Sequence, residues 1–329
     1  MIRSPFHAGE QALQERAGAR ERSERAGQRM VRDFMPDQHR EFFAAQPLVL
    51  VGSLDARGQP WASLLVGEPG FLHSPDAHTL RVRARPAAGD PLAANLAAGA
   101  PLGLLGIEFA TRRRNRMNGT VLRVDPAGFE VGVRQSFGNC PQYIQARSAL
   151  FATASPTERP ARHEGALLSP RAAALAGRAD TFFIASASPR AGAGDDPAEG
   201  VDVSHRGGKP GFVRVGVENG RSTLTAPDFS GNYLFNTLGN LALEPRAGLL
   251  FVDFESGDVL SLAGTAQVIW GGPELAAFAG AQRLVKLQVE EGRLLEKACA
   301  LRWSAPQQAP QLARTGSWRE VDAALAGGG

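Results

Sequence analysis

The order of short apolar runs in the first half of the chain is repeated in its second half. Runs of about four to eight apolar residues, cut by turns that contain glycine, are typical of strands. Residues 48–51 correspond to 181–185, residues 101–109 to 246–254, residues 118–121 to 263–266, and the turn at 57–61 to residues 207–212. The repeat predicts two copies of one antiparallel barrel, because a barrel leaves no exposed strand edges.

The first copy also contains turn and helix signals. Residues 48–51 and 61–66 flank a glycine-containing turn and predict a hairpin, and further strands are expected at 79–82, 102–109, 119–124 and 128–134, with a short helix within 87–100. Before the barrel, residues 9–34 and 36–45 predict two helices. The many charges of the first helix are most simply a solvated face, and a partner-binding role is the alternative.

These signals divide the 329 residues into five segments. We expect an N-terminal helical segment at 1–46, a first barrel at 47–151, a linker rich in Ala, Pro, Ser and Arg at 152–178, a second barrel at 179–305 and a tail at 306–329. A hydrophobic content of 43% with 21% charged residues is that of a globular protein.

Several function classes are disfavoured. The 36 basic and 33 acidic residues are spread along the chain, so nucleic-acid binding is not expected. No run approaches the roughly 18 apolar residues of a membrane span. Cys140 and Cys299 cannot form a disulfide framework or a four-cysteine zinc site, and the six histidines lack metal-ligand spacing. Without a signal-peptide layout, the expected location is cytoplasmic.

Two polar segments could carry chemistry. Residues 201–211 gather a hydroxyl, an imidazole and two cations around glycines, an arrangement that suits phosphate oxygens or an ordinary hairpin turn. Residues 224–241 lead from a strand into a helix that Asp228 or Ser230 could cap, with Asn232, Asn236 and Asn240 spaced along one face. Structural capping is the alternative, but the two segments together favour a phosphate-bearing ligand.

Five stretches, residues 6–10, 112–119, 137–145, 204–212 and 227–241, resemble the pyridoxamine 5′-phosphate oxidase-like, FMN-binding split-barrel family, and within it a tandem-barrel bacterial subgroup. The resemblance implies a mainly β fold with flanking helices: two tandem six-stranded antiparallel split β-barrels. It also implies flavin mononucleotide (FMN) at an interface between two barrels. FAD, a deazaflavin or haem are the alternative cofactors.

The resemblance also indicates site residues. Carried onto this chain, the cofactor-binding positions are Ser204, Arg206, Gly207, Lys209, Thr225, Asp228, Ser230, Asn232 and Asn236, joined by Arg113, Arg114 and Asn118 from the arginine-rich turn. The first barrel lacks equivalents of residues 204–210 and 228–240. We therefore expect it to be the copy that does not bind the cofactor itself and that contributes one wall of the site in the second barrel. The clustered arginines at 112–116 repel one another unless a flavin phosphate or carboxylates across the interface neutralise them.

The function implied is that of an FMN-dependent oxidoreductase that transfers hydride or electrons between the flavin and an unidentified small organic substrate. A flavin- or haem-binding carrier without its own turnover is the alternative, and a partner-binding module is a third hypothesis. His205 and Cys140 are the candidate catalytic residues. The alternatives are that His205 is a turn histidine without a catalytic role and that Cys140 is an inert cysteine. We expect a small-molecule substrate, a reductase or nicotinamide electron donor, and a homodimer, with neither nucleic acid nor membrane as partner.

Overall fold

The computed structural model describes residues 3–151 and 159–327 and contains two large antiparallel sheets with the same strand order. The first runs β2-β1-β5-β6-β7-β4-β3 and the second β11-β10-β14-β15-β16-β13-β12. The first sheet consists of β1 (Leu48–Leu54), β2 (Pro60–Val66), β3 (Leu72–Asp76), β4 (Thr79–Val82), β5 (Pro101–Glu108), β6 (Arg113–Asp125) and β7 (Gly128–Asn139). The second consists of β10 (Thr181–Ala187), β11 (Val201–Gly207), β12 (Arg214–Glu218), β13 (Arg221–Phe229), β14 (Arg246–Val252), β15 (Val259–Ile269) and β16 (Ala281–Leu295).

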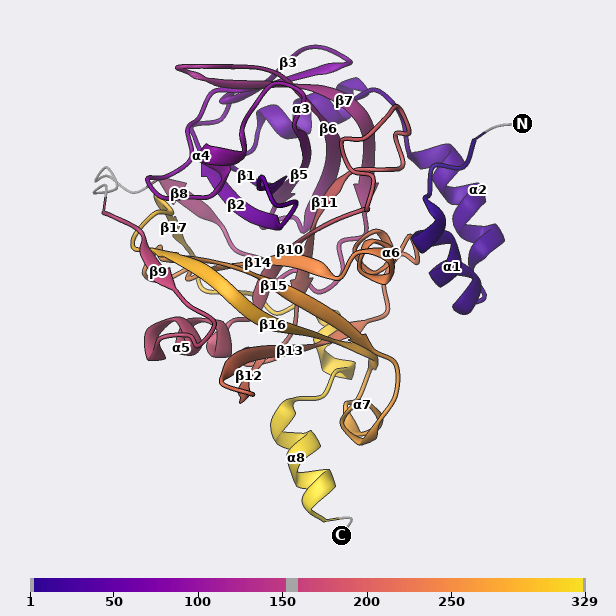
Figure 1. The fold of residues 1–329 in the computed structure, drawn as a ribbon, viewed down its shortest axis with the longest axis vertical. Helices are drawn as coiled ribbons and strands as arrows, with labels where there is room; N and C mark the ends of the chain where they lie inside the picture. The colour runs from indigo at the N-terminus through magenta and orange to yellow at the C-terminus, as the bar shows by residue number, and fades with distance from the viewer. Residues whose placement is uncertain (1–2, 152–158, 328–329) are drawn as a thin grey trace.

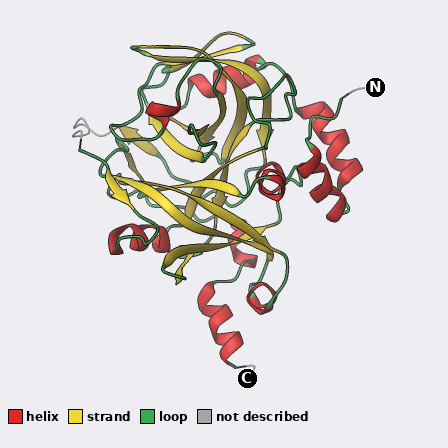
Figure 2. Cartoon of the chain, in the orientation of Figure 1, coloured by secondary structure: helices red, strands yellow, loops and turns green. Residues whose placement is uncertain are grey.

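The predicted fold class is confirmed: the protein is mainly β, with two tandem barrels and helices around them. Each sheet contains the six strands expected and a further short edge strand, β3 or β12, and the second sheet also contains the short strand β9 (Arg162–Glu164), which pairs with β16. Figure 1 shows the first barrel stacked on the second, and Figure 2 shows the helices at the periphery of the sheets. No helix in the described ranges is both long enough and apolar enough to cross a membrane.

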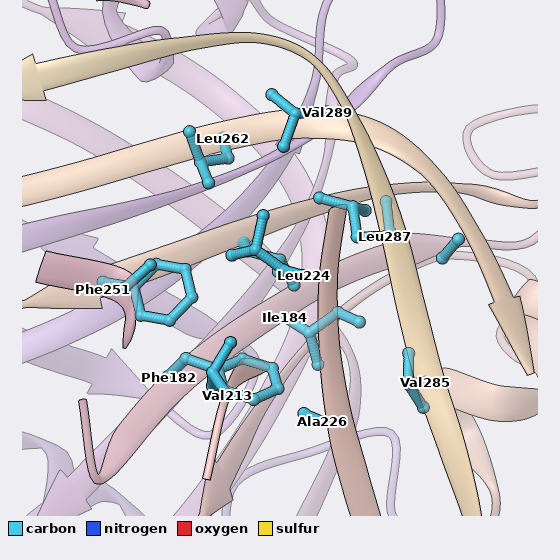
Figure 3. Packing of buried hydrophobic residues seen from close by; sticks show 14 of the residues in the cluster. Phe182, Ile184, Val213, Leu224, Ala226, Phe251, Leu262, Val285, Leu287 and Val289 are labelled. Carbon is cyan, nitrogen blue, oxygen red and sulfur yellow. The ribbon is translucent and has the colours of Figure 1, made fainter. Parts of the chain in front are cut away.

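Strands β1 and β10 are buried on both faces, which explains their continuous apolar sequences. In β10, Phe182 and Ile184 point into the core of the second barrel, where they pack among the side chains of Figure 3. Phe183 and Ala185 point the other way, into a separate apolar layer between the barrels. In β1, Leu48 and Leu50 enter the same layer. The two barrels therefore share a hydrophobic interface within one chain.

Matching bulges support the repeat. The register of β6 against β7 shifts between Asn118 and Gly119, and that of β15 against β16 shifts between Ala263 and Gly264. A methyl group on Gly119 would overlap the carbonyl oxygen of Gly132, and one on Gly264 would overlap that of Gln288. The correspondence of 118–121 with 263–266 is thus a shared backbone irregularity that requires glycine.

The pairing of residues 57–61 with 207–212 is wrong. Leu48 of β1 faces Val66, and Thr181 of β10 faces Gly207, so the segment after β2 corresponds to the segment after β11. The true counterparts are residues 67–71 and 208–212, which both read Gly-X-Pro-Gly-Phe. In each segment the second glycine, Gly70 or Gly211, has a positive φ, of 95° or 82° respectively.

Each barrel is preceded by a helix of its own. Helix α3 (Asp37–Ala44) leads into β1, close to the expected 36–45, and α5 (Pro170–Arg178) leads into β10. The segment predicted as a linker, 152–178, therefore contains an element of the second repeat, together with β9 (Arg162–Glu164), which pairs with β16. Part of that prediction, residues 152–158, lies outside the described residues.

The remaining elements depart from expectation in length. The helix expected at 9–34 is two helices, α1 (Ala8–Arg16) and α2 (Arg20–Met30), because Gly18 between them has a positive φ of 61°. The helix expected within 87–100 is only α4 (Leu92–Asn95). The other elements are α6 (Asn236–Leu243), α7 (Pro273–Ala277), the short pair β8 (Ala149–Phe151) and β17 (Leu301–Trp303), a 3-10 turn at Pro310–Arg314, and α8 (Trp318–Ala326) in the predicted tail.

Helices α1 and α2 lie at one side of the molecule beside α6 (Figure 1). Gly9 of α1 and Gly239 of α6 allow this close approach, because a methyl group on Gly9 would overlap the carbonyl oxygen of Gly239. The N-terminal segment is thereby tied to the second barrel, although it precedes the first in the sequence. The loop before α6 is thus enclosed between α1, α2 and the sheet.

Candidate functional site

A pocket of about 870 Å³, its open mouth included, lies between the two barrels. The second barrel contributes the end of β11, the end of β13, the loop before α6 and Arg283 of β16. The first barrel contributes β6 and the end of β7 with the loop that follows. The lining residues are Leu105, Arg114, Arg116, Asn139, Gln142, Tyr143, Ser204, His205, Arg206, Gly207, Pro227, Asp228, Phe229, Ser230, Gly231, Asn232, Tyr233, Phe235, Asn236, Thr237, Leu238 and Arg283.

Four arginines line this pocket, and three of them are paired with carboxylates. Asp228 accepts from Nε of Arg283 at 2.7 Å and lies 3.1 Å from Nε of Arg206. Arg116, which is 2% exposed, donates to Asp202 at 2.8 Å. Since Arg116 belongs to the first barrel and Asp202 to the second, this buried pair joins the barrels. Of the two alternatives for neutralising the arginine cluster, a carboxylate across the interface is therefore the one found for Arg116.

Arg114 is the fourth arginine. In the described part of the chain, no carboxylate lies within ion-pair distance of its guanidinium, which donates instead to the carbonyl oxygen of Cys140 at 2.7 Å. Burial, and then the positive charges of Arg206 and Arg116, lower the pKa of Arg114 to about 9. A cation whose charged form is disfavoured in this way would be stabilised by an anion in the pocket.

His205 lies on β11 at the pocket wall and is 3% exposed. Burial, followed by the charges of Arg114 and Arg206, lowers its pKa well below the usual value, so the ring is neutral at pH 7. Its Nε2 has no hydrogen-bond partner among the described residues. A buried ring nitrogen without a partner, in the wall of a pocket, is a position for a hydrogen bond to a ligand.

The loop before α6 is held in a strained conformation. Tyr233 and Phe235 have positive φ angles of 59° and 65°, which non-glycine residues rarely adopt. Helices α1 and α2 support the loop: Gln14 donates to the carbonyl of Leu234 at 3.1 Å and Ser23 to that of Tyr233 at 3.0 Å. The N-terminal helices therefore shape the pocket from behind.

A buried polar network lies beneath the pocket. Asp202 accepts from Asn118 at 2.8 Å and from Asn240 at 2.9 Å, in addition to Arg116. Ser204 accepts from Thr237 at 2.9 Å and from Arg116. These bonds fix β11 and the first turn of α6 relative to each other, so the groups at the pocket surface are preorganised.

Two predictions about the segment 224–241 are wrong: that Asp228 or Ser230 caps the helix, and that its three asparagines lie on one helical face. Phe235 precedes the first turn of α6, which has no side-chain cap, because Asp228 is bound by two arginines and Ser230 is 3.4 Å from the hydroxyl of Tyr233. Asn232 lies before the helix and accepts from the backbone N–H of Leu234, so it does not share a helical face with Asn236 and Asn240.

The structure brings many of the predicted site residues together and places others elsewhere. Those that line the pocket are Ser204, Arg206, Gly207, Asp228, Ser230, Asn232, Asn236, Arg114 and the candidate catalytic His205. Those that do not line it are Lys209, Thr225, Arg113, Asn118 and Cys140. Lys209 donates to the carbonyl of Thr315 at 2.6 Å and so holds the segment before α8. Arg113 and Cys140 line an adjoining groove.

Sequence reasoning missed Arg283, Asn139, Gln142, Tyr143 and the role of Arg116. Arg116 lies in the stretch 112–119, and Asn139, Gln142 and Tyr143 lie in the stretch 137–145, both of which the sequence had already singled out. Arg283 carries no local signal, because only the pairing of β16 with β13 brings it opposite Asp228. No cluster of His, Cys, Asp and Glu suited to a metal ion occurs within residues 3–151 and 159–327.

Residues 35–162 match a family model described as pyridoxamine 5′-phosphate oxidase. Solved structures similar to parts of the chain include HupZ from Group A Streptococcus (13% identity, 38% of this chain and 90% of that one, TM-score 0.28). HutZ, the heme storage protein from Vibrio cholerae, shares 12% identity over 40% of this chain and 95% of its own, with a TM-score of 0.26. A pyridoxamine 5′-phosphate oxidase-related, FMN binding protein from Nostoc punctiforme shares 11% identity over 43% and 98%, with a TM-score of 0.25. No curated protein matches the sequence.

Proposed function

The chain belongs to the pyridoxamine 5′-phosphate oxidase-like family, and from this premise we propose that the pocket between its barrels binds FMN and serves a flavin-dependent oxidoreductase. The observation that carries the proposal is Arg114, the pocket arginine whose charge no described carboxylate balances. A phosphate monoester is the anion that a guanidinium recognises well, because its oxygens match the fork of N–H donors.

The other lining residues fit the remaining parts of FMN. Hydroxyl and amide groups suited to a polyol chain come from Ser230, Asn232 and Asn236. A flat ring system needs apolar surface, and Leu105, Pro227 and Leu238 provide it.

FMN, when bound, supplies reversible transfer of a hydride or of single electrons, and the protein supplies position and electrostatics. The neutral ring of His205 offers its free Nε2 to the ligand as a hydrogen-bonding group. The substrate would be a small organic molecule that enters through the open mouth of the pocket, and the electrons would come from a nicotinamide nucleotide or a reductase.

Haem binding is the second candidate, and the same nitrogen favours it, because an accessible neutral imidazole can ligate iron. The lining argues for the flavin. Four arginines, three amide side chains on asparagines and one on Gln142 surround the pocket, whereas a porphyrin needs broad apolar walls on both faces.

The test is the absorbance spectrum of the purified protein, followed by FMN titration of the wild type and of Arg114→Ala. One charge-assisted contact is worth about 1.5–3 kcal/mol, so the variant should bind FMN about 10- to 150-fold more weakly. Arg83→Ala, which removes an exposed arginine of the first barrel outside the pocket, is the matched control and should bind as the wild type does.

A protein that takes up no FMN would refute the proposal, as would a folded Arg114→Ala variant with unchanged affinity. A Soret band, lost in His205→Ala, would instead favour the haem candidate. Bleaching of the flavin absorbance by a reduced nicotinamide nucleotide without oxygen would support turnover over a carrier role.

A further inference from the structure

An open groove of about 1160 Å³ adjoins the pocket and shares Arg114, Asn139 and Asn232 with it. The groove runs between the end of α2, the start of α3, the start of β6 and the end of β7. Its lining residues are Arg29, Met30, Arg32, Gln38, His39, Arg113, Arg114, Asn115, Gly138, Asn139, Cys140, Pro141 and Asn232. Four of these lining residues are arginines, and none of the lining residues is Asp or Glu.

The positive charge of the groove is unbalanced. Within residues 3–151 and 159–327, no carboxylate forms an ion pair with Arg29, Arg32 or Arg113, and the guanidinium of Arg113 lies over the ring of Phe42 at 5.3 Å. Burial first, and then the charges of Arg32 and Arg113, lower the pKa of the buried His39 in the same wall. Like charges that accumulate in one groove are stabilised by a bound polyanion.

Asn139 gives an independent indication of a ligand. Its side-chain nitrogen Nδ2 is buried and has no hydrogen-bond partner in the described part of the chain. The residue lines both the groove and the pocket, so an acceptor atom at their junction would satisfy it. A buried donor without a partner is costly unless a ligand or water occupies the position.

We propose that the groove binds the pyrophosphate of a dinucleotide, the second substrate of the enzyme, so that the rest of the molecule reaches the flavin pocket. One phosphate could engage two guanidinium groups, but Arg29, Arg32 and Arg113 extend the positive surface away from Arg114, which suits two linked phosphates. The proposal rests on the proposed function only for what lies in the pocket, since Arg29, Arg32 and Arg113 line the groove and not the pocket.

The test is calorimetric titration of the full chain with inorganic pyrophosphate at constant ionic strength, with and without saturating FMN. The double variant Arg29→Ala/Arg32→Ala should weaken binding at least about tenfold and leave FMN retention unchanged. Arg25→Ala is the matched control, because Arg25 is an exposed residue of the same helix that pairs with Glu21 and lies outside the groove. Oxidised nicotinamide adenine dinucleotide should compete with pyrophosphate.

Unchanged pyrophosphate binding in the double variant would overturn the proposal. Equal affinity for phosphate and pyrophosphate, or failure of the dinucleotide to compete, would overturn the assignment of ligand class. Because the titration without FMN does not depend on flavin uptake, failure of the proposed function would appear separately, as a protein that binds pyrophosphate but no FMN.

Discussion

Asp90 of the first barrel offers a quantitative test of the structure. Its carboxylate is 4% exposed and accepts from the hydroxyl of Ser63 at 2.5 Å and from the backbone N–H of Leu92 at 2.8 Å. Burial raises its pKa from 3.8 to about 6, because the two hydrogen bonds compensate only part of the lost hydration. The ionised carboxylate is therefore destabilising at pH 7.

The difference between about 6 and 3.8 corresponds to about 3 kcal/mol, at about 1.36 kcal/mol per pKa unit. The folded state holds this proton more tightly than the unfolded state does. The free energy of unfolding should therefore fall as pH rises from about 4 to about 6, and remain lowered above that range. Asp90→Asn keeps an oxygen acceptor for both hydrogen bonds but cannot ionise, so it should not show this fall.

The assay is urea denaturation of the wild type and Asp90→Asn between pH 4 and 7.5. The variant should be up to about 3 kcal/mol more stable than the wild type at pH 7, with the difference shrinking toward pH 4. Asp195→Asn, at an exposed position, controls for the change in net charge. A stability difference between Asp90→Asn and the wild type that does not vary with pH would refute the reasoning.

Two further predictions concern the pocket. Gly207→Ala should destabilise the chain and weaken FMN binding, since its methyl group would overlap the carbonyl oxygen of Tyr143 and push β11 from the first barrel; Gly200→Ala, with open space around it, should do neither, and equal melting temperatures for the two variants would contradict this. FMN affinity should fall by up to about tenfold per pH unit above pH 9, where Arg114 loses its proton, as measured by quenching of flavin fluorescence; the fall should be absent in Arg114→Ala, and a flat wild-type profile to pH 10 would count against the role of Arg114.

Much of the fold could be predicted from the sequence because its strands are short apolar runs with glycines at required positions. Gly119 and Gly264 mark bulges that no other residue would fit, so their correspondence was a reliable signal. The pairing of residues 57–61 with 207–212 was wrong because two successive turns of the first repeat, 57–61 and 67–71, both contain a glycine close to a proline. The five-residue match of 67–71 with 208–212 was the stronger signal, since it retains a phenylalanine that packs under the turn.

The candidate site was predictable only where it is local. Residues 204–207 and 228–236 stood out as dense polar segments, and both reach the pocket. Arg283 could not be found this way, because its position depends on the register between β13 and β16, which are separated by more than fifty residues along the chain. The same holds for the support that Gln14 gives to the loop before α6.

The repeat gives the interface between the barrels two equivalent regions, and the pocket lies in one of them. Strand pairing sets Leu64 of the first barrel at the place of His205 in the second, and Val259 of the second barrel at the place of Arg114 in the first. The equivalent region is thus apolar.

Three aromatic side chains fill that equivalent region. Phe109, Phe254 and Trp303 contact one another edge to face, with ring centroids 5.1–5.6 Å apart. All three belong to the apolar layer between the barrels. Buried arginines and an unpaired histidine cost stability that an aromatic cluster does not. The interface therefore contains a polar pocket in one region and an apolar aromatic cluster in the equivalent region. The aromatic cluster keeps the barrels associated, so the interface tolerates an electrostatically unfavourable pocket, where the charge of a bound ligand can offset the cost in stability.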